Sequence, residues 1–360
     1  MINRASWTLL MVGIAPMAPA QPQIYSELET LPGRVVPVQY FSALPNEDGE
    51  SKGMEFSSAV QFQGRILLSD DEVNAIKSPA LVSPDAGGLA LFEVMPAPAG
   101  APLRLSRPFA EAFAPVLATP DAFDDMESTT VRGQTLYSFG SHSYNKSGKR
   151  RPQREVAIRI VAAADGSVTV QRKPTGLRDK LVTTIASMPG VNKSVEEIAT
   201  EINIEGLTID PNSNDLLIGL KRPLVGPEER ALVFRIANID AFFDSPDAEL
   251  SPQLEAVFSV DRSGISSIEW DPVLEGYMLA TNAKSSEYQE SSLWFARDLK
   301  HAPREICRFR SKALEGVARI SEGPYAGNLI LAFDEETVDK NWRTRDGGSV
   351  AILKWGQKRH

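Results

Sequence analysis

The chain has 360 residues, of which 42% are hydrophobic and 24% charged, and its formal net charge at pH 7 is −9. This composition is typical of a globular protein with one large domain or two smaller ones, and the negative charge argues against nucleic-acid binding, which needs a basic face. A single cysteine excludes an intrachain disulfide, and three histidines argue against a zinc site built mainly from histidine.

Residues 1–20 have the features of an export signal. Arg4 gives the start of the chain a positive charge, residues 7–17 are mostly apolar, and A-P-A at 18–20 resembles a cleavage site. The apolar run is too short to span a bilayer, and no longer run follows it. We therefore expect a periplasmic or secreted protein without a membrane span; an ordinary frayed N-terminus or a buried strand is the alternative for this segment.

A similar unit occurs five times along the rest of the chain. Each unit begins with a glutamate, which is followed by a short apolar strand and then by a strand that alternates polar and apolar residues. The five glutamates are Glu55, Glu127, Glu205, Glu269 and Glu315. The apolar strands cover 66–69, 136–140, 216–220, 277–281 and 329–333, and the next strands cover 90–94, 156–160, 231–236, 292–297 and 351–355. Fourth strands are expected at 103–105, 167–172, 254–260 and 304–309.

Repeated four-stranded units separated by turns are typical of a β-propeller. We predict an all-β fold with one propeller domain over 34–356 and five four-stranded blades. The fifth unit lacks a fourth strand, and the alternating run at 34–41 could complete its sheet and close the ring. A degenerate sixth blade within 95–125 and a pair of β-sandwiches are the alternatives.

One segment departs from the β pattern. Residues 175–202 contain apolar residues at helical spacing, followed by S-V-E-E at 194–197, a sequence typical of a capping box. We predict a small helical insertion between the second and third blades. Its apolar stripe, which is expected to pack on the propeller, consists of Leu177, Leu181, Ile185 and Met188.

The repeated glutamates are candidate ligands for a metal. The innermost strand of a propeller blade runs along the central channel, so acids at equivalent positions would converge near one mouth. Close carboxylates cannot all stay ionised unless cations compensate them. Acidic residues also follow the second strands of the first and fifth units, and oxygen ligands there suit Ca²⁺. Solvated turns are the alternative for these residues. The candidate metal ligands are Glu55, Asp71, Glu72, Glu127, Glu205, Glu269, Glu315 and Asp334.

A basic loop at 140–155, G-S-H-S-Y-N-K-S-G-K-R-R-P-Q-R-E, joins the second and third strands of the second unit. Lys221 and Arg222 stand at the equivalent end of the third unit, so basic and acidic loops are expected on one face. Arginine binds carboxylate or phosphate through two hydrogen bonds, and His142 could titrate near neutral pH. A loop that is merely solvated is the alternative. The candidate ligand-binding residues are Asn145, Lys149, Arg150, Arg154, Lys221 and Arg222.

This loop, together with N-I-E-G-L-T-I-D-P at 203–211, resembles the bacterial family called domain of unknown function 3616. Other parts of the resemblance are L-L-I-G-L-K-R-P-L at 216–224, S-D-D-E-V-N at 69–74 and S-G-I-S-S-I-E at 263–269, and it covers roughly 55–335. The chain departs from that pattern at Ser128, where Gly is usual, and at Lys221, where Arg is common. The resemblance implies a propeller-like fold and no established activity. More distantly, the blades resemble phytase-like esterases and gluconolactonase-type propellers, which implies carboxylates that hold a divalent metal.

Two functions follow from these observations. The first is a metal-dependent hydrolase for an anionic phosphoester or lactone in the central channel, in which Glu205 and His142 are the candidate catalytic residues. The second is a non-catalytic propeller that binds a small ligand or a protein in the periplasm. The sequence contains no G-x-S-x-G, no H-E-x-x-H and no P-loop, which argues against the enzymes that use these motifs.

Overall fold

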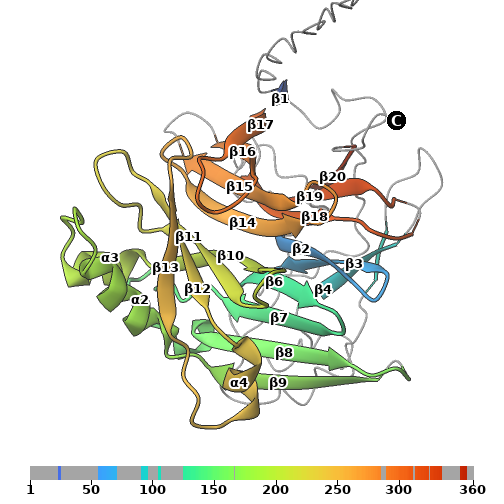
Figure 1. Cartoon of the computed structure of the whole chain (residues 1–360), viewed down its shortest axis with the longest axis horizontal. Helices are drawn as coiled ribbons and strands as arrows, with labels where there is room; N and C mark the ends of the chain where they lie inside the picture. The colour runs from blue at the N-terminus through green and yellow to red at the C-terminus, as the bar shows by residue number, and fades with distance from the viewer. Residues whose placement is uncertain are drawn as a thin grey trace, which may run out of the picture.

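The computed structural model describes residues 23–25, 56–70, 91–95, 104–106, 125–165, 167–284, 289–310, 313–323, 325–334 and 349–354. Within them the strands form five sheets, and consecutive strands of each repeated unit pair antiparallel (Figure 1). No helix of the described part is both long and apolar enough to cross a bilayer.

The five sheets follow one another along the chain. The first contains β2 (Phe56–Phe62), β3 (Arg65–Asp70), β4 (Leu91–Met95) and β5 (Arg104–Ser106). The second contains β6 (Met126–Arg132), β7 (Thr135–Gly140), β8 (Val156–Ala162) and β9 (Val168–Pro174). The third contains β10 (Asn203–Ile209), β11 (Leu216–Arg222), β12 (Ala231–Ile236) and β13 (Pro252–Phe258). The fourth contains β14 (Gly264–Asp271), β15 (Gly276–Lys284), β16 (Gln289–Ala296) and β17 (Arg304–Arg310). The fifth contains β18 (Ala313–Arg319), β19 (Asn328–Asp334) and β20 (Ser349–Lys354).

The first strands of the sheets make a closed series of contacts. They follow the order β2, β6, β10, β14 and β18, and β18 in turn contacts β2. The all-β, propeller-like arrangement is therefore confirmed. Four sheets have the four strands of a full blade, whereas the last has three described strands. The segment expected to complete it, 34–41, lies outside the described residues, as does most of 95–125, so five full blades stay a prediction.

One strand was not expected. β1 (Gln23–Tyr25) pairs parallel with β17, where Ile24 lies opposite Arg308. This pairing adds a fifth strand to the outer edge of the fourth sheet.

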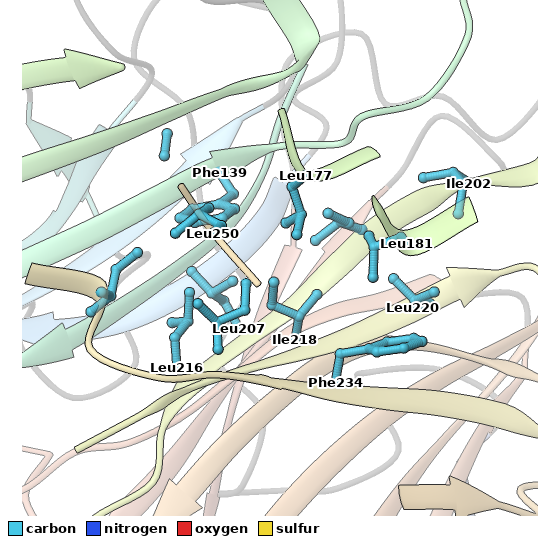
Figure 2. Packing of buried hydrophobic residues seen from close by; sticks show 14 of the residues in the cluster. Phe139, Leu177, Leu181, Ile202, Leu207, Leu216, Ile218, Leu220, Phe234 and Leu250 are labelled. Carbon is cyan, nitrogen blue, oxygen red and sulfur yellow. The ribbon is translucent and has the colours of Figure 1, made fainter. Parts of the chain in front are cut away.

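The core lies between neighbouring sheets. On β11, Leu216, Ile218 and Leu220 belong to one buried cluster, in which Phe234 of β12 also lies (Figure 2). Leu217, between them, belongs to a second cluster on the other face of the same sheet. Successive side chains of a strand point to opposite faces, so a strand buried on both faces reads as a continuous apolar run such as L-L-I-G-L.

The helical insertion at 175–202 is confirmed. It contains α2 (Leu177–Ala186) and α3 (Val195–Glu201), which pack against each other. The Ser194 hydroxyl accepts a hydrogen bond from the amide of Glu197, whose carboxylate accepts one from the Ser194 amide, so the capping box is present. Leu177, Leu181 and Ile185 of α2 are buried in the same cluster as Leu216, Ile218 and Leu220 of β11. The helix therefore covers one face of the third sheet. A further short helix, α4 (Ile239–Asp244), was not predicted.

Each innermost strand carries an irregularity of register at the same place. In β10, Ile204 pairs with Leu220 and Gly206 with Gly219, so Glu205 between them has no partner in β11. Such an extra residue is a β-bulge, which bends the strand and redirects side chains. The extra residues of the five strands are Ser57, Glu127, Glu205, Ser266 and Glu315.

The residue after the bulge is small in every sheet. A Cβ atom built on Gly316 would lie 2.7 Å from the backbone nitrogen of Ala59, which belongs to the neighbouring innermost strand. Since real Cβ atoms do not approach this closely, glycine at this point lets the two strands pack. The small residues are Ser58, Ser128, Gly206, Ser267 and Gly316.

Candidate functional site

The bulges decide which of the repeated glutamates are equivalent. Glu127, Glu205 and Glu315 occupy the bulge in the second, third and fifth sheets. Glu269 does not, because Ser266 is the extra residue of β14 and Glu269 lies three residues further along. Glu55 lies outside the described residues, and Ser57 holds the bulge of β2. The sequence-based register of the first and fourth units was therefore wrong, since it counted from the nearest glutamate.

Each of the two bulge serines donates a hydrogen bond to the backbone of the next sheet. The Ser57 hydroxyl donates to the carbonyl oxygen of Met126 at 2.5 Å, and the Ser266 hydroxyl donates to that of Leu314 at 2.6 Å. Each acceptor immediately precedes the bulge of the next sheet. Serine at this position therefore links adjacent innermost strands, whereas glutamate brings a carboxyl group to the same level of the ring.

Lys221 joins two of the bulge glutamates. It comes from β11, and its Nζ lies 2.8 Å from Glu205 Oε1 and 3.2 Å from Glu315 Oε1. The side chains of Glu205 and Glu315 are only 3% and 7% exposed, whereas that of Lys221 is 31% exposed. Because the two carboxyl groups are buried, water screens their attraction to Lys221 less than it screens an ion pair at the surface. Lys221 thus connects the third and fifth sheets near the axis of the ring.

Two asparagine amides complete this cluster, which we call the Lys221 centre: Lys221, Glu205, Glu315, Asn203 and Asn282. Asn203 Nδ2 donates to Glu205 Oε1 at 2.7 Å, and Asn282 Nδ2 donates to Glu315 Oε1 at 2.6 Å. The amide nitrogens face the carboxyl groups because these groups are the acceptors, so the amide oxygens point elsewhere. Glu205 Oε2, Asn203 Oδ1 and Asn282 Oδ1 are buried and have no hydrogen-bond partner.

Burial and charge set the protonation of the centre. Burial lowers the pKa of Lys221, but the charges of Glu205, Glu315 and Glu127 outweigh it and hold that pKa well above its usual value. Burial raises the pKa of Glu315 well above its usual value, and Glu205 and Asp334 raise it further, while Lys221 opposes them. Lys221 is therefore held in its charged form, and Glu315 takes up a proton more readily than a carboxyl group in water does.

The centre does not fit the expected Ca²⁺ ion between Glu205 and Glu315. An ammonium nitrogen already lies between these groups, and Ca²⁺ takes six to eight oxygens at about 2.3–2.6 Å. No group of three or more His, Cys, Asp or Glu residues that could hold a metal is found in the described part of the chain. The candidate ligands Glu55, Asp71 and Glu72 lie outside that part.

Asp334 has the place in β19 that Lys221 has in β11. Phe333 pairs with Leu314, the residue before the bulge, as Leu220 pairs with Ile204, and the next residue is Asp334 in one sheet and Lys221 in the other. By the same register Asn282 is the counterpart in β15. The sequence analysis missed Asn282 and Asn203; Asn282 follows its apolar strand directly, a signal that could have found it.

Glu269 lies further along β14, three residues past the bulge. Thr208 Oγ1 of β10 is 3.5 Å from Glu269 Oε2. Burial raises the pKa of Glu269 to about 8, which the hydrogen bond with Thr208 opposes and the charge of Asp271 increases. The structure brings Glu269 together with Thr208, and not with the bulge glutamates.

Two arginines of the basic loop, Arg150 and Arg154, pair with nearby carboxylates. Arg150 makes two hydrogen bonds to the carboxylate of Glu155, at 2.6 and 2.7 Å, and a third to Asp179 at 3.0 Å. Arg154 pairs with Asp125 at 2.8 Å. An anionic ligand at either arginine would have to compete with these carboxylates.

Asn145 and its neighbours also serve the turn. Asn145 Oδ1 accepts hydrogen bonds from the backbone amides of Ser147 and Lys149, at 3.1 and 2.9 Å. This arrangement is an Asx turn, in which the side chain stabilises the loop. The side chains of Lys149 and Arg222 are exposed.

His142 is fully buried, and both of its ring nitrogens are engaged. Nδ1 lies 2.7 Å from the carbonyl oxygen of Gly140, so it carries the proton, and Nε2 lies 2.6 Å from Thr175 Oγ1. Burial lowers the pKa of His142 to about 4, against the effect of the Gly140 hydrogen bond. His142 is therefore held inside the basic loop with both ring nitrogens hydrogen-bonded, so neither is free to act on a ligand.

Comparisons with known proteins add no family. No family model matches the chain, and no curated protein matches it in sequence. Among solved structures, a family 43 β-1,3-galactosidase with galactodeoxynojirimycin has a TM-score of 0.42 at 9% identity and covers 88% of this chain and 94% of its own. A hypothetical protein from Leishmania major has a TM-score of 0.41 at 9% identity, covering 91% of each chain. An α-L-arabinofuranosidase from Podospora anserina in complex with cellotriose has a TM-score of 0.39 at 9% identity, covering 89% of this chain and 98% of its own.

Likenesses of this degree carry no argument about function. The class that the sheets themselves define is an all-β, propeller-like protein. The resemblance to domain of unknown function 3616 stays an expectation.

Proposed function

We propose that this chain is an exported propeller that binds a small polar molecule at the Lys221 centre, near the mouth of its channel. The observation that carries the proposal is the unpartnered Glu205 Oε2, in a side chain only 3% exposed. A buried carboxylate oxygen without a hydrogen bond costs stability, and such groups are concentrated where a ligand or water supplies the missing donor. Two amide oxygens in the same condition lie in the same centre.

The charges of the centre favour a neutral or cationic molecule over an anionic one. Two buried carboxyl groups, those of Glu205 and Glu315, lie beside the one ammonium of Lys221. The arginines that were expected to hold an anion, Arg150 and Arg154, already pair with carboxylates. An anionic phosphoester would therefore meet a surplus of negative charge.

Hydrolysis is the second candidate function, favoured by the contrast between the two buried carboxyl groups. Burial raises the pKa of Glu315, whereas Glu205 lies 2.8 Å from the ammonium of Lys221, and a general acid and a general base require such a contrast. In such a reaction Glu315 would protonate the leaving group, Glu205 would accept a proton from water, and Lys221 would stabilise negative charge. A metal-dependent version, as expected for a lactone or phosphoester, would need Lys221 to leave its place.

We also propose that five blades close the ring, with 34–41 as the fourth strand of the last sheet, and that cleavage after residue 20 produces the mature chain. The closed series of innermost strands supports the first proposal. Hydrogen exchange should show slow amide exchange across 34–41; fast exchange would contradict it. Sequencing of the secreted protein should begin at Gln21, and an intact Met1 would contradict export by cleavage.

Thermal-shift measurements on the purified mature protein test the binding proposal. The probes are a neutral polyol (inositol), n-propylammonium, δ-gluconolactone, p-nitrophenyl phosphate and CaCl₂, at matched ionic strength. We expect a neutral or cationic probe to raise the melting temperature of the wild type and of the control Glu249→Gln, a change of an exposed glutamate. Glu205→Gln should abolish the shift. If no probe shifts the wild type, or if Glu205→Gln responds equally, the proposal fails.

Turnover of δ-gluconolactone and p-nitrophenyl phosphate, with and without Ca²⁺, tests hydrolysis. Metal-independent turnover that Glu315→Gln reduces by about 100-fold or more would support the acid–base pair. Equal turnover in wild type and Glu315→Gln would rule out Glu315 as the acid.

A further inference from the structure

We propose that the ligand of the Lys221 centre presents a primary ammonium group, and that the ammonium of Lys221 is a tethered stand-in for it. This inference rests on the proposed binding function and names the chemistry of the ligand. In this account Lys221 closes the site in the free protein and competes with the ligand.

The position of Lys221 Nζ shows what the centre accommodates. The nitrogen contacts Glu205 Oε1 at 2.8 Å and Glu315 Oε1 at 3.2 Å, which are ordinary distances for charge-assisted hydrogen bonds and ion pairs. Both carboxyl groups are also held by an asparagine amide, so their orientation is fixed from a second side. The centre is therefore built around an ammonium nitrogen.

The negative charge and the unpartnered oxygens of the Lys221 centre both favour the binding of a second ammonium group. Lys221 Nζ lies 2.8 Å from Glu205 and 3.2 Å from Glu315, so one ammonium lies between two buried carboxyl groups. Three buried oxygens still lack a donor: Glu205 Oε2, Asn203 Oδ1 and Asn282 Oδ1. An ammonium group supplies a positive charge and three N–H donors, so it would both neutralise a carboxylate and donate hydrogen bonds to these oxygens.

Other ligand chemistries fit the same groups less well. A hydroxyl supplies one donor and no charge, and an anion adds to the negative surplus. A Ca²⁺ ion needs six to eight oxygens, whereas Asn203 and Asn282 turn their N–H donors toward Glu205 Oε1 and Glu315 Oε1. These donors take up acceptor positions that a metal would need.

Access to the centre depends on Lys221. The three unpartnered oxygens are buried, so a ligand reaches them only when a covering group moves. Lys221 is the most exposed of the three charged side chains, at 31%, and its four-carbon stem is flexible. Withdrawal of Lys221 would expose Glu205 and Glu315 together and leave them without their counter-charge, a condition that an incoming ammonium relieves.

Chemical complementation of a truncated lysine tests this inference. Lys221→Ala removes the atoms that n-propylammonium restores, and Lys221→Met keeps the stem so that NH₄⁺ restores the charge. We expect each matched cation, at about 100 mM, to raise the melting temperature of its variant by roughly 3 °C or more above the effect of tetramethylammonium, which has charge but no N–H donor. If Lys221→Ala does not fold, Lys221→Met carries the test.

Lys193→Ala is the matched control, because Lys193 is 34% exposed and pairs with Glu201 outside the centre. It should show no preference for n-propylammonium over tetramethylammonium, and adding Glu205→Gln to Lys221→Ala should abolish the preference. Equal effects of the two cations on both Lys221 variants, or a larger effect of CaCl₂, would overturn the inference. After such a result, the binding proposal still stands if another probe raises the melting temperature of the wild type but not that of Glu205→Gln. It fails if no probe does so.

Discussion

The basic loop at 140–155 and the Lys221 centre both concentrate charge, but they do so differently. In the loop, Arg150 meets Glu155 five residues away, with hydrogen bonds of 2.6 and 2.7 Å. In the centre, Lys221 meets Glu315 across 94 residues of chain, and Glu205 keeps an oxygen without a partner. Charge that is dense along the sequence is neutralised locally, whereas charge gathered by the fold is left incompletely satisfied. A functional site is therefore better supported at the centre.

The largest expected effect is on stability when the cation of the centre is removed. Lys221→Met leaves Glu205 and Glu315 buried without their counter-charge, which typically costs about 3–5 kcal/mol of unfolding free energy. Urea denaturation at pH 7 measures this cost. A loss below about 1 kcal/mol would place Lys221 in solvent and remove the contrast with the loop.

The second effect is a pH dependence that belongs to the loop's buried histidine. The pKa of His142 is about 4 in the folded chain against 6.5 ordinarily, so the folded state binds fewer protons between these values. The contribution of His142 to stability is therefore complete above pH 6.5 and is lost as the pH falls toward 4, by about 3 kcal/mol in total. His142→Gln should lack this part of the pH dependence in denaturation curves between pH 4 and 7. Parallel curves for the two proteins would contradict a buried, neutral His142.

The smallest effect is expected for the cations of the loop. Arg150→Gln removes a pair in which the arginine side chain is 43% exposed, so water and salt screen much of the interaction. We expect a loss of about 1 kcal/mol, and less than about 0.5 kcal/mol for the exposed control Lys149→Gln. Denaturation in low and high salt measures both. If Arg150→Gln lowered the free energy of unfolding as much as Lys221→Met does, the basic loop and the Lys221 centre would not differ in how strongly their charges are coupled to the fold.

Much of the fold could be predicted because its signals are local. The strand L-L-I-G-L reads as apolar throughout since both faces of its sheet are buried, and S-V-E-E at 194–197 marks a helix start through hydrogen bonds within four residues. The pairing of β1 with β17 joins segments far apart in the chain, and no local pattern announces it.

The site was predicted only in part, because the bulge that aligns the five innermost strands is occupied by serine in two of them. A search for charged residues therefore does not find the bulge in those two strands. Counting glutamates selected Glu205 and Glu315 correctly as equivalents, but it selected Glu269 in a sheet where Ser266 holds the bulge. The small residue that follows each bulge, such as Gly206 or Gly316, is the better marker, since packing between neighbouring strands requires it. Lys221 was assigned to an anionic ligand because sequence alone did not show which carboxylates it would meet.

A double-mutant cycle between Lys221 and Glu315 tests the central claim most directly. The unfolding free energies of the wild type, Lys221→Met, Glu315→Gln and the double variant give the coupling between two residues that only the fold brings within 3.2 Å. We predict a coupling of about 1.5 kcal/mol or more, well above the coupling measured in the same way for the exposed pair Lys180 and Glu249. A coupling of zero between Lys221 and Glu315 would show that they do not meet, and it would contradict the site, its proposed ligand and the function built on them.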